Sequence, residues 1–447
     1  MARAKKEAAL TPEDRLQAAL VPDWERPYKL PENWCWTTVG AINQYVGISA
    51  DPTKAKNKTF ELYSVPSSAD NYPEIVLGAD IGSTKQSVKK GDVLLCKINP
   101  RINRVWKVSK YTDHSLLASS EWIVIRNSGL ISNYLMWCFR SPYFRGYMLS
   151  NVSGVGGSLM RAQPKFVQGY PVPVPPLAEQ QRIVDRIESL FAKLDEAKEK
   201  AQAVVDSFET RKAAILHKAF TGELTAKWRE EHGVSIDNWK TTRFDSVAAI
   251  RSNLVDPAEY QSFPHIAPDN IEKKTGVLLE CHTIAEDGVT SGKHRFYSGQ
   301  ILYSKIRPYL SKAVVVDFDG LCSADMYPIE AYQNARCLWY YMLSDEFLLQ
   351  ASTAGSRSVL PKINQKELSA LTVHLPTNDR EQEEIARILD ELFDKEQQTK
   401  EAAEIVLDQI DLMKKSILAR AFRGELGTND PSEESAVELL KEIIRRG

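Results

Sequence analysis

Apolar and polar positions alternate over two long stretches with the spacing of a coiled coil. In the first stretch, apolar or small side chains recur at steps of four and three residues, the a/d pattern of a helix packed against another helix. These positions are Ile183, Ile187, Leu190, Leu194, Ala197, Ala201, Val204 and Phe208. Neither Pro nor Gly occurs from Leu177 to Phe220. The pattern therefore predicts one helix of about 42 residues, roughly 60 Å long.

The second stretch repeats the first at a constant distance along the chain. Residues 179–193 read EQQRIVDRIESLFAK, and residues 381–395 read EQEEIARILDELFDK. The sequence ILHKAFTGEL at 215–224 returns as ILARAFRGEL at 417–426. Both pairs are 202 residues apart (381 − 179 and 417 − 215), so the segment between them has kept its length. The chain is therefore a tandem duplication.

The repeated helices are expected to pack on each other. Six of the eight seam positions stay apolar or small in the second copy, and Glu396 and Thr399 depart from the pattern. Gly222 and Gly424 follow the two stretches, as is common at helix ends. A shared register in both copies favours an antiparallel coiled coil with pseudo-two-fold symmetry. The alternative is that each helix packs only on its own globular segment.

The segments between the helices are predicted to be mixed α/β. GDVLLCKINP at 91–100 matches GQILYSKIRP at 299–308 with an offset of 208. Strands are expected at Asp92–Ile98, Glu121–Ile125, Gln300–Ile306 and Lys312–Val316, and helices at Tyr134–Arg145 and Arg336–Leu349. Thr11 followed by Pro12 is typical of a helix start. The predicted order is an N-terminal arm (1–30), a first globular segment (31–175), a first helix region (176–231), a second globular segment (232–376), a second helix region (377–427) and a C-terminal tail (428–447).

The net charge of −2 conceals a basic first globular segment. Residues 31–175 hold 16 Lys or Arg and 9 Asp or Glu, whereas residues 232–376 hold 14 and 16. Basic residues, with Asn or Tyr between them, cluster at matching places in both segments. Because Arg and Asn can read base edges and Lys mostly meets phosphate, these clusters predict contact with DNA. An ordinary solvated face is the alternative.

The candidate DNA-binding residues lie in the matching strand-turn regions and in two small-residue loops, GVGGSLMR at 154–161 and GSRSVL at 355–360. The candidates are Lys85, Lys89, Lys97, Asn99, Arg101, Asn103, Arg104, Lys107, Ser158, Arg161, Lys293, Arg295, Lys305, Arg307, Tyr309, Lys312, Arg357 and Ser358.

Catalytic patterns are weak throughout the sequence. GVTSGK at 288–293 has one residue too few for a phosphate-binding loop. Asp269, Glu272 and Lys274 faintly resemble a metal-nuclease triad but stand too close together. We therefore expect neither a catalytic residue nor a bound metal. An atypical metal-dependent nuclease and a coiled-coil adaptor without DNA binding remain alternatives.

The compartment is expected to be the cytoplasm. Six scattered cysteines form no CxxC pair, which favours reduced thiols. The N-terminus carries charges where a signal peptide would be apolar, and no apolar run approaches the length of a membrane helix.

The duplicated architecture resembles the specificity subunit of Type I restriction-modification systems. The resemblance rests on LPENW at 30–34, PPLAEQQRI at 175–183, the two strand-turn segments at 91–100 and 299–308, and the repeated helix ends. It extends over nearly the whole chain beyond the first 30 residues. The second copy departs from it, with PTNDR at 376–380 in place of the PPLAEQQ start.

This resemblance implies a non-catalytic subunit that serves in defence against foreign DNA. Each globular segment would be a target recognition domain that reads one half of a split, asymmetric site in double-stranded DNA, and the helices would fix the spacing. Two methyltransferase subunits, using S-adenosylmethionine, would dock on the repeated helices. Two restriction subunits, using ATP and Mg, would complete the complex. The specificity subunit itself would bind no cofactor.

Overall fold

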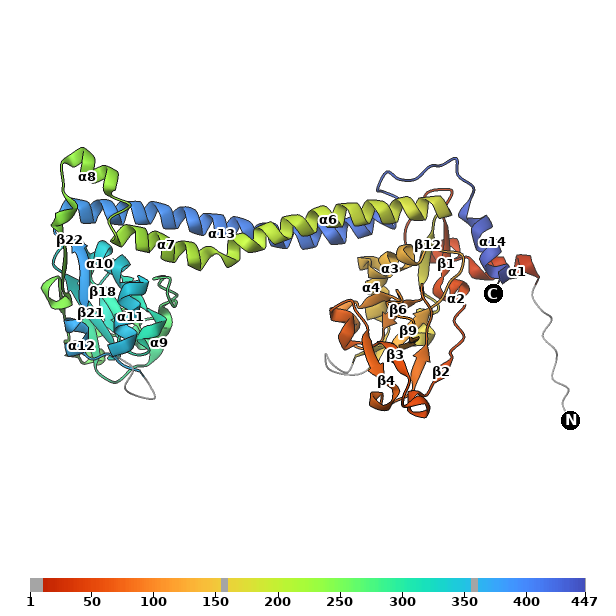
Figure 1. The fold of residues 1–447 in the computed structure, drawn as a ribbon, viewed down its shortest axis with the longest axis horizontal. Helices are drawn as coiled ribbons and strands as arrows, with labels where there is room; N and C mark the ends of the chain where they lie inside the picture. The colour runs from red at the N-terminus through yellow and green to blue at the C-terminus, as the bar shows by residue number, and fades with distance from the viewer. Residues whose placement is uncertain (1–10, 154–159, 355–360, 447) are drawn as a thin grey trace. The chain divides into compact units, whose positions relative to one another are not determined.

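The computed structural model describes residues 11–153, 160–354 and 361–446 (Figure 1). The chain forms two compact units. The first contains the chain up to Lys200 together with the chain from Val406 onward, and the second runs from Ala201 to Ile405. Each globular segment therefore lies in its own unit. In the described part of the chain, no helix is both long and apolar enough to cross a membrane.

The first unit contains two main sheets. The five-stranded sheet has the order β2-β5-β8-β3-β4, with β2 Ser49–Ala50, β5 Lys85–Ser87, β8 Ser115–Ala118, β3 Thr59–Tyr63 and β4 Glu74–Leu77. The three-stranded sheet has the order β7-β6-β9, with β7 Val105–Lys107, β6 Val93–Cys96 and β9 Trp122–Ile125. Two strand pairs accompany them, β1 Cys35–Thr38 with β12 Pro171–Val174, and β10 Val152–Ser153 with β11 Arg161–Ala162.

The second unit repeats this plan. One four-stranded sheet has the order β15-β17-β20-β16, with β15 Leu254–Val255, β17 Lys293–Phe296, β20 Gly320–Cys322 and β16 His265–Ile266. The other has the order β14-β21-β18-β19, with β14 Ala248–Ile250, β21 Met326–Ala331, β18 Ile301–Ser304 and β19 Ala313–Val315. β13 Trp239–Arg243 pairs with β22 Thr372–Pro376. In both units a central strand, β8 or β20, has one antiparallel and one parallel neighbour. The four strands predicted from the sequence are confirmed as β6, β9, β18 and β19.

The predicted globular helices are each two helices in the structure. α3 Ser132–Arg140 gives way to α4 Pro142–Ser150, and α10 Ala335–Met342 to α11 Asp345–Ala354. A serine stands at each junction: Ser141 Oγ accepts from Phe144 N (3.3 Å), and Ser344 Oγ accepts from Phe347 N (3.4 Å). A side-chain cap thus satisfies a backbone N–H at the start of the second helix of each pair. The remaining short helices are α2 Val39–Ile42, α5 Pro164–Val167, α8 Ala226–His232, α9 Ile284–Asp287 and α12 Gln365–Ala370.

The predicted helix at the N-terminus is confirmed. α1 Pro12–Ala19 begins with a capping box in which Thr11 and Asp14 each bond the backbone of the other. It packs against the C-terminal helix α14 Ala436–Arg446, whose Leu440 and Ile443 are buried in the core of the first unit. The first unit is therefore closed by α1 and α14 together.

The first long helix is interrupted, contrary to the prediction of one helix from 177 to 220. α6 Leu177–Asp206 and α7 Phe208–Phe220 meet at Ser207, whereas α13 Asp379–Ala421 runs unbroken. Ser207 Oγ donates to the carbonyl oxygens of Ala203 (2.6 Å) and Val204 (3.2 Å). Side-chain bonds of this kind compete with the helical hydrogen bonds and bend the helix.

The long helices are antiparallel within each unit, which confirms the predicted fold class. In the first unit, Lys198 pairs with Asp411 (3.7 Å) and Asp195 with Lys414. In the second, Arg211 Nε donates to Glu396 Oε2 (2.7 Å), and Lys400 lies 5.0 Å from the ring centre of Phe208. Residue numbers rise on one helix as they fall on the other. Glu396, one of the two departures from the apolar seam, thus has an ion-pair partner.

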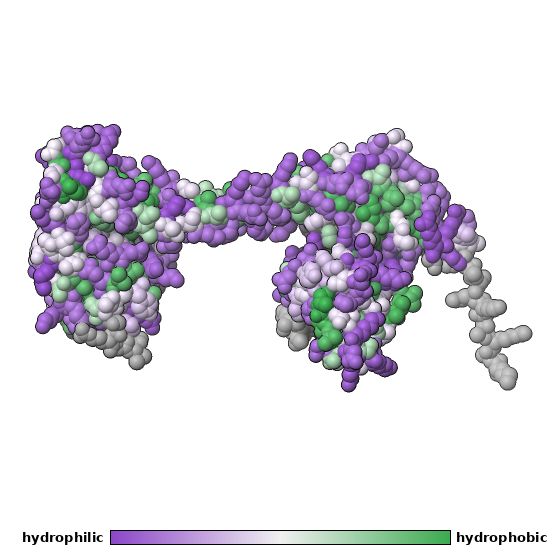
Figure 2. All heavy atoms as spheres, viewed as in Figure 1, coloured by the Kyte–Doolittle hydropathy of each residue, from purple (hydrophilic) through white to green (hydrophobic). Residues whose placement is uncertain are grey.

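The long helices also pack on the globular segments. Packing of helix on helix and packing of helix on globular segment therefore both occur. The first core contains Ile183 and Ile187 of α6, Phe422 just beyond α13, and side chains of the sheets and α3. The second core contains Phe220 of α7 and Ile385 of α13 in the same way. On the face shown in Figure 2, the surface of the long helices is mainly hydrophilic with a few apolar patches.

Candidate nucleic-acid interface

The strand-turn segments form the same unusual loop in both units. β6 is followed by the 3₁₀ helix η5 Pro100–Ile102, and β18 by η10 Pro308–Leu310. A left-handed residue stands on each side of each turn: Asn99 (φ 46°) and Asn103 (φ 52°) in the first unit, Arg307 (φ 49°) and Ser311 (φ 45°) in the second. Such conformations cost on the order of 1 kcal/mol or more for residues other than glycine and cluster at functional sites. The two copies therefore share a backbone shape, while their side chains differ.

A second segment is bound to each loop. Asn99 N donates to Met160 O and Ala162 N to Lys97 O, both at 2.9 Å. In the second unit, Arg307 N donates to Pro361 O (2.7 Å) and Ile363 N to Lys305 O (2.9 Å). These bonds bring the candidate Arg161 beside the loop at 97–103, a proximity that the sequence pattern did not predict. Ser158, Arg357 and Ser358 lie outside the described residues.

An acidic residue, missed in the sequence, lies beside each loop. Glu121 accepts from Arg161 (3.2 Å) in the first unit. Asp325 pairs with Lys362 (3.3 Å) and with Lys305 (3.8 Å) in the second. Lys97 N donates to Glu121 O and Lys305 N to Asp325 O, so the two carboxylates occupy equivalent places. The duplication could have revealed these two acids, because each is the residue directly before a strand, Glu121 before β9 and Asp325 before β21.

Several candidate cations are engaged within the protein. Lys85 Nζ donates to Ser83 Oγ (2.5 Å), and Lys293 Nζ donates to Ser291 Oγ (2.8 Å), so this contact is itself duplicated. Lys107 bonds Asn133 at 2.5 Å, and Lys312 donates to Pro268 O at 2.6 Å. Burial lowers the pKa of both Lys85 and Lys293. These lysines hold their loops in place, which leaves fewer donors for a nucleic acid.

Other candidates are exposed and have no side-chain partner among the described residues. Arg101 and Lys89 are exposed in the first unit, and Arg307 and Tyr309 in the second. Arg101 and Tyr309 occupy equivalent positions in the two 3₁₀ turns, as do Asn99 and Arg307 at the left-handed residue before each turn. Lys97 and Arg104 are half-buried, and the Asn103 amide donates to Arg140 O (3.0 Å). Each loop therefore carries its own pair of polar side chains on a common frame, although Asn99 is half-buried and its Oδ1 is enclosed. Arg295 lies elsewhere, on β17.

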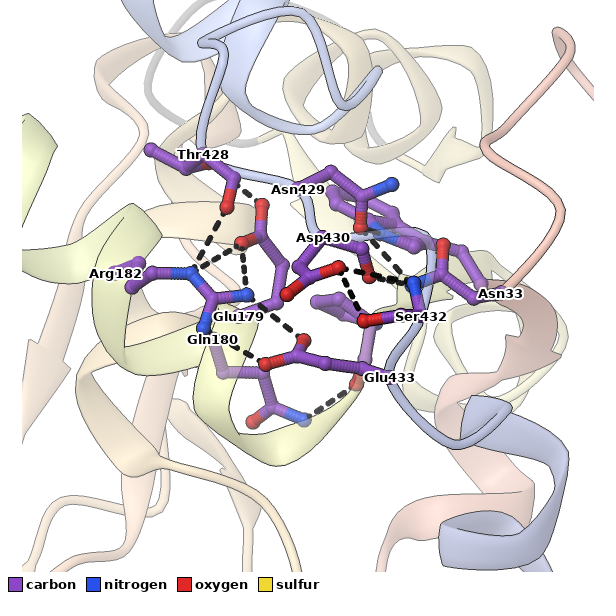
Figure 3. A network of polar contacts seen from close by, with 11 residues as sticks. Asn33, Glu179, Gln180, Arg182, Thr428, Asn429, Asp430, Ser432 and Glu433 are labelled. Carbon is purple, nitrogen blue, oxygen red and sulfur yellow. Dashed lines mark hydrogen bonds and ion pairs between the residues drawn. The ribbon is translucent and has the colours of Figure 1, made fainter.

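Each repeated helix start holds a buried glutamate. Glu179 of α6 is fully buried and accepts from Thr428 Oγ1 (2.6 Å) and Arg182 Nε (3.0 Å). Figure 3 shows Arg182 lying between Glu179 and Glu433, which it binds through two hydrogen bonds of 2.8 Å. Burial raises the pKa of Glu179. The segment that follows α13 is thereby fastened to the start of α6.

The second unit contains the equivalent arrangement with more donors. Glu381 accepts from Thr225 Oγ1 (2.8 Å), Arg229 Nη1 (2.7 Å) and Trp239 Nε1 (3.0 Å), and its other oxygen accepts from Asn238 Nδ2 (2.9 Å). Burial acts to raise the pKa of Glu381, but these hydrogen bonds outweigh it and lower the pKa. The segment after α7 is thus fastened to the start of α13. The departure from the PPLAEQQ start in the second copy leaves this contact intact.

The nuclease alternative gains no support from the geometry. Asp269 is fully exposed, and its nearest ion-pair partner is Lys312 at 3.8 Å. The backbone of Lys274 is engaged with Leu310 and Lys212. Over the described ranges, no group of three or more His, Cys, Asp or Glu side chains is placed to hold a metal ion.

The two globular segments share their plan, and each carries a polar loop. Each is also fastened to the paired long helices. Together these features define a duplicated recognition scaffold. Residues 47–205 and 236–406 each match the Type I restriction modification DNA specificity domain. The chain belongs to this family. Family membership confirms the expected role of a DNA specificity subunit that is not itself an enzyme, and it favours neither the nuclease nor the adaptor alternative.

Named relatives agree with this assignment. The chain is 35% identical to the EcoDI specificity subunit of a Type I restriction enzyme from Escherichia coli, over 76% of this chain and 82% of that protein. It is 23% identical to the EcoKI specificity subunit of Escherichia coli strain K12, over 93% and 96%.

Two solved structures share the fold. One comes from a study of complex assembly and conformational transition of the type I R-M system, with a TM-score of 0.70 and 20% identity. The other is the HsdS subunit from Thermoanaerobacter tengcongensis, with a TM-score of 0.63 and 20% identity. Each comparison covers 90% of this chain and 100% of the other.

Proposed function

We propose that the two globular segments read the two halves of a split, asymmetric site in double-stranded DNA. The observation that carries this proposal is the shared loop with unlike side chains. The same left-handed, 3₁₀, left-handed backbone carries the half-buried Asn99 and the exposed Arg101 in one unit, and the exposed Arg307 and Tyr309 in the other. A common frame gives both segments the same approach to the DNA, and different side chains give each half-site its own sequence.

The long helices are the proposed docking surface for two methyltransferase subunits. Relatives named as specificity subunits of Type I restriction enzymes support a multi-subunit setting. S-adenosylmethionine would be bound by the methyltransferases, and ATP and Mg by two restriction subunits in the full complex. The chain itself would supply sequence recognition and the contacts that hold the assembly together.

The experiment is a methylation map of the source genome by long-read sequencing, with and without this gene. We expect deletion to abolish methylation at one split, asymmetric motif, and a plasmid copy of the gene to restore it. Methylation that is unchanged while the partner genes are expressed would contradict the proposal. The motif obtained also defines the DNA used in the experiments below.

A further inference from the structure

Arg295 stands on β17 among three aromatic rings. Its guanidinium carbon lies 4.8 Å from the ring centre of Tyr297, 5.4 Å from that of Tyr260 and 5.9 Å from that of Phe263. Cations over aromatic faces at these distances are attracted by the ring quadrupole. Tyr260 and Phe263 come from the segment before β16, and Tyr297 is the residue after β17. The rings therefore contact the guanidinium from two different segments and restrict its orientation.

This guanidinium has no carboxylate partner among the residues that the structure describes. Its Nε is buried and has no hydrogen-bond acceptor. Asp287, the acid that pairs with His265 (2.6 Å) of the same sheet, is also bonded to His282 (3.2 Å). The other arginines of the second globular segment that the structure describes, apart from the exposed Arg307, all have carboxylate partners; they are Arg243, Arg251 and Arg336. A half-buried charge without an acceptor is costly unless a ligand supplies one.

The strand pairing places Arg295 on the face of its sheet opposite Phe296, where its neighbours Leu321 and His265 are buried and Arg295 itself is half-buried. Arg295 and His265 are both cross-strand partners of Leu321, so the three side chains share one face. The alternate positions Ile266, Phe296 and Cys322 form the buried core on the other face. Because Nε is buried, the two terminal amino groups are the guanidinium donors left for a ligand.

The duplicated first unit lacks this arginine. β5 and β17 are equivalent strands with an offset of 208, and Ser87 occupies the position of Arg295. Ser87 pairs with Leu117 of β8 as Arg295 pairs with Leu321 of β20. A side chain that supports the fold common to both units is expected in both copies, as Lys85 and Lys293 are. A group that reads one half of an asymmetric site is expected in one copy only.

We propose that Arg295 reads a guanine in the DNA half-site bound by the second globular segment. The inference rests on the proposed function. Two terminal amino groups of one guanidinium match the O6 and N7 acceptors of guanine, the commonest specific contact in the major groove. Phosphate contacts are typically made by exposed, mobile cations, whereas base reading needs a side chain whose orientation is fixed in advance. The three rings fix it.

The test uses the full-length chain assembled with its methyltransferase partners and duplexes that carry the mapped motif. Each guanine of the second half-site is replaced in turn by 7-deazaguanine, which lacks the N7 acceptor. For the wild-type complex we expect one replacement to weaken binding by about tenfold. Arg295→Ala should bind the natural site about 10- to 100-fold more weakly and should be indifferent to that replacement. Arg295→Lys should lose most of the same discrimination, because lysine lacks the planar fork.

Arg243→Ala is the matched control, because Arg243 lies in the same unit but is exposed and paired with Asp245. It should keep full sensitivity to 7-deazaguanine. Thermal unfolding of each variant complex shows whether the second unit remains folded, and Arg295→Lys preserves the charge if Arg295→Ala does not fold.

Failure of this inference differs from failure of the proposed function. If the wild-type complex prefers the motif but Arg295→Ala and Arg295→Lys both respond to 7-deazaguanine as the wild type does, the guanine assignment is wrong. Uniform weakening on all sequences with a smaller salt dependence would make Arg295 a phosphate contact and would also overturn it. A wild-type complex without preference for any split site would contradict the proposed function itself.

Discussion

At the scale of single residues, Glu381 shows how a buried charge is accommodated. Its side chain is fully buried, and four side chains donate to its carboxylate. Arg229, which supplies the opposite charge, is itself nearly buried and also donates to Gly222 O (2.8 Å). Removing one member of such a set leaves the others desolvated without partners, so the loss exceeds the value of one hydrogen bond.

We expect Glu381→Gln to reduce the free energy of unfolding by about 3–5 kcal/mol at neutral pH, because Arg229 is left unpaired. The pKa of Glu381 is lowered in the fold, so its ionised form contributes stability above the pKa of the unfolded carboxyl. That contribution is lost as the pH falls through the folded pKa. The wild type and the variant should therefore converge in acid. Urea denaturation across a pH series, with exposed Glu383→Gln as control, measures this; a constant difference would contradict it.

Asp325 gives a second expectation at the residue scale. Asp325→Asn removes the carboxylate that pairs with Lys362 and Lys305 beside the loop of the second unit. Freed cations should raise the affinity for DNA of any sequence, by up to about fivefold, since an exposed pair is worth up to roughly 1 kcal/mol. Binding titrations over a range of salt concentrations test this. Asp317→Asn, at an exposed acid without a described partner, should change little. Equal effects of the two variants would show that only net charge matters.

At the scale of elements, the ends of the long helices are fixed by left-handed glycines. Gly222 follows α7 with φ +75°, and Gly424 follows α13 with φ +76°. Each turns the chain toward the glutamate at the start of the other long helix. A Cβ on Gly424 would lie 2.4 Å from Pro31 Cγ, so this turn is crowded as well as left-handed.

Gly424→Ala should therefore destabilise the first unit by more than Gly427→Ala. Gly427 has φ +71°, yet a Cβ there would meet no heavy atom within 4 Å. Gly427→Ala should cost about 1 kcal/mol from backbone strain alone, and Gly424→Ala should add the cost of displacing Pro31. Thermal denaturation of both variants makes the comparison. Equal losses would show that backbone strain alone accounts for the cost.

The sequence was sufficient for the elements that depend on local pattern. The heptad spacing and the 202-residue offset predicted the paired helices, because a seam between helices constrains spacing at every turn. The break at Ser207 could not be predicted, since it depends on where one hydroxyl points. The same limit applies to Lys85 and Lys293, whose neighbours at Ser83 and Ser291 satisfy their donors. The rings around Arg295 are brought together only by the sheet.

At the scale of the whole molecule, the long helices belong to both units. α6 passes from the first unit to the second between Lys200 and Ala201, and α13 passes back between Ile405 and Val406. The spacing between the two half-sites is therefore expected to follow the length of the helices. Because they are antiparallel, a change in one helix needs a matching change in the other.

We expect matched seven-residue insertions after Lys200 and after Ile405 to lengthen the DNA spacer by about three base pairs. Seven helical residues add roughly 10 Å, close to three base-pair steps, and one heptad keeps the seam in register. The methylated motif of a strain that carries the modified gene gives the spacer directly. Insertion into α6 alone is the control and should abolish methylation. An unchanged spacer after the matched insertion would show that the helices do not set the distance.

The two units also differ in when they can form during synthesis of the chain. The second unit is one continuous stretch and contains everything that binds Glu381, so it can be completed once Ile405 has left the ribosome. The first unit needs Thr428 and Glu433 at Glu179 and Arg182, and it needs α14 in its core. The first unit, whose N-terminal part is synthesised first, is thus the last to complete its fold. We therefore expect a chain that terminates between Ile405 and Thr428 to keep the second recognition segment folded and to leave the first without its closing helix α14.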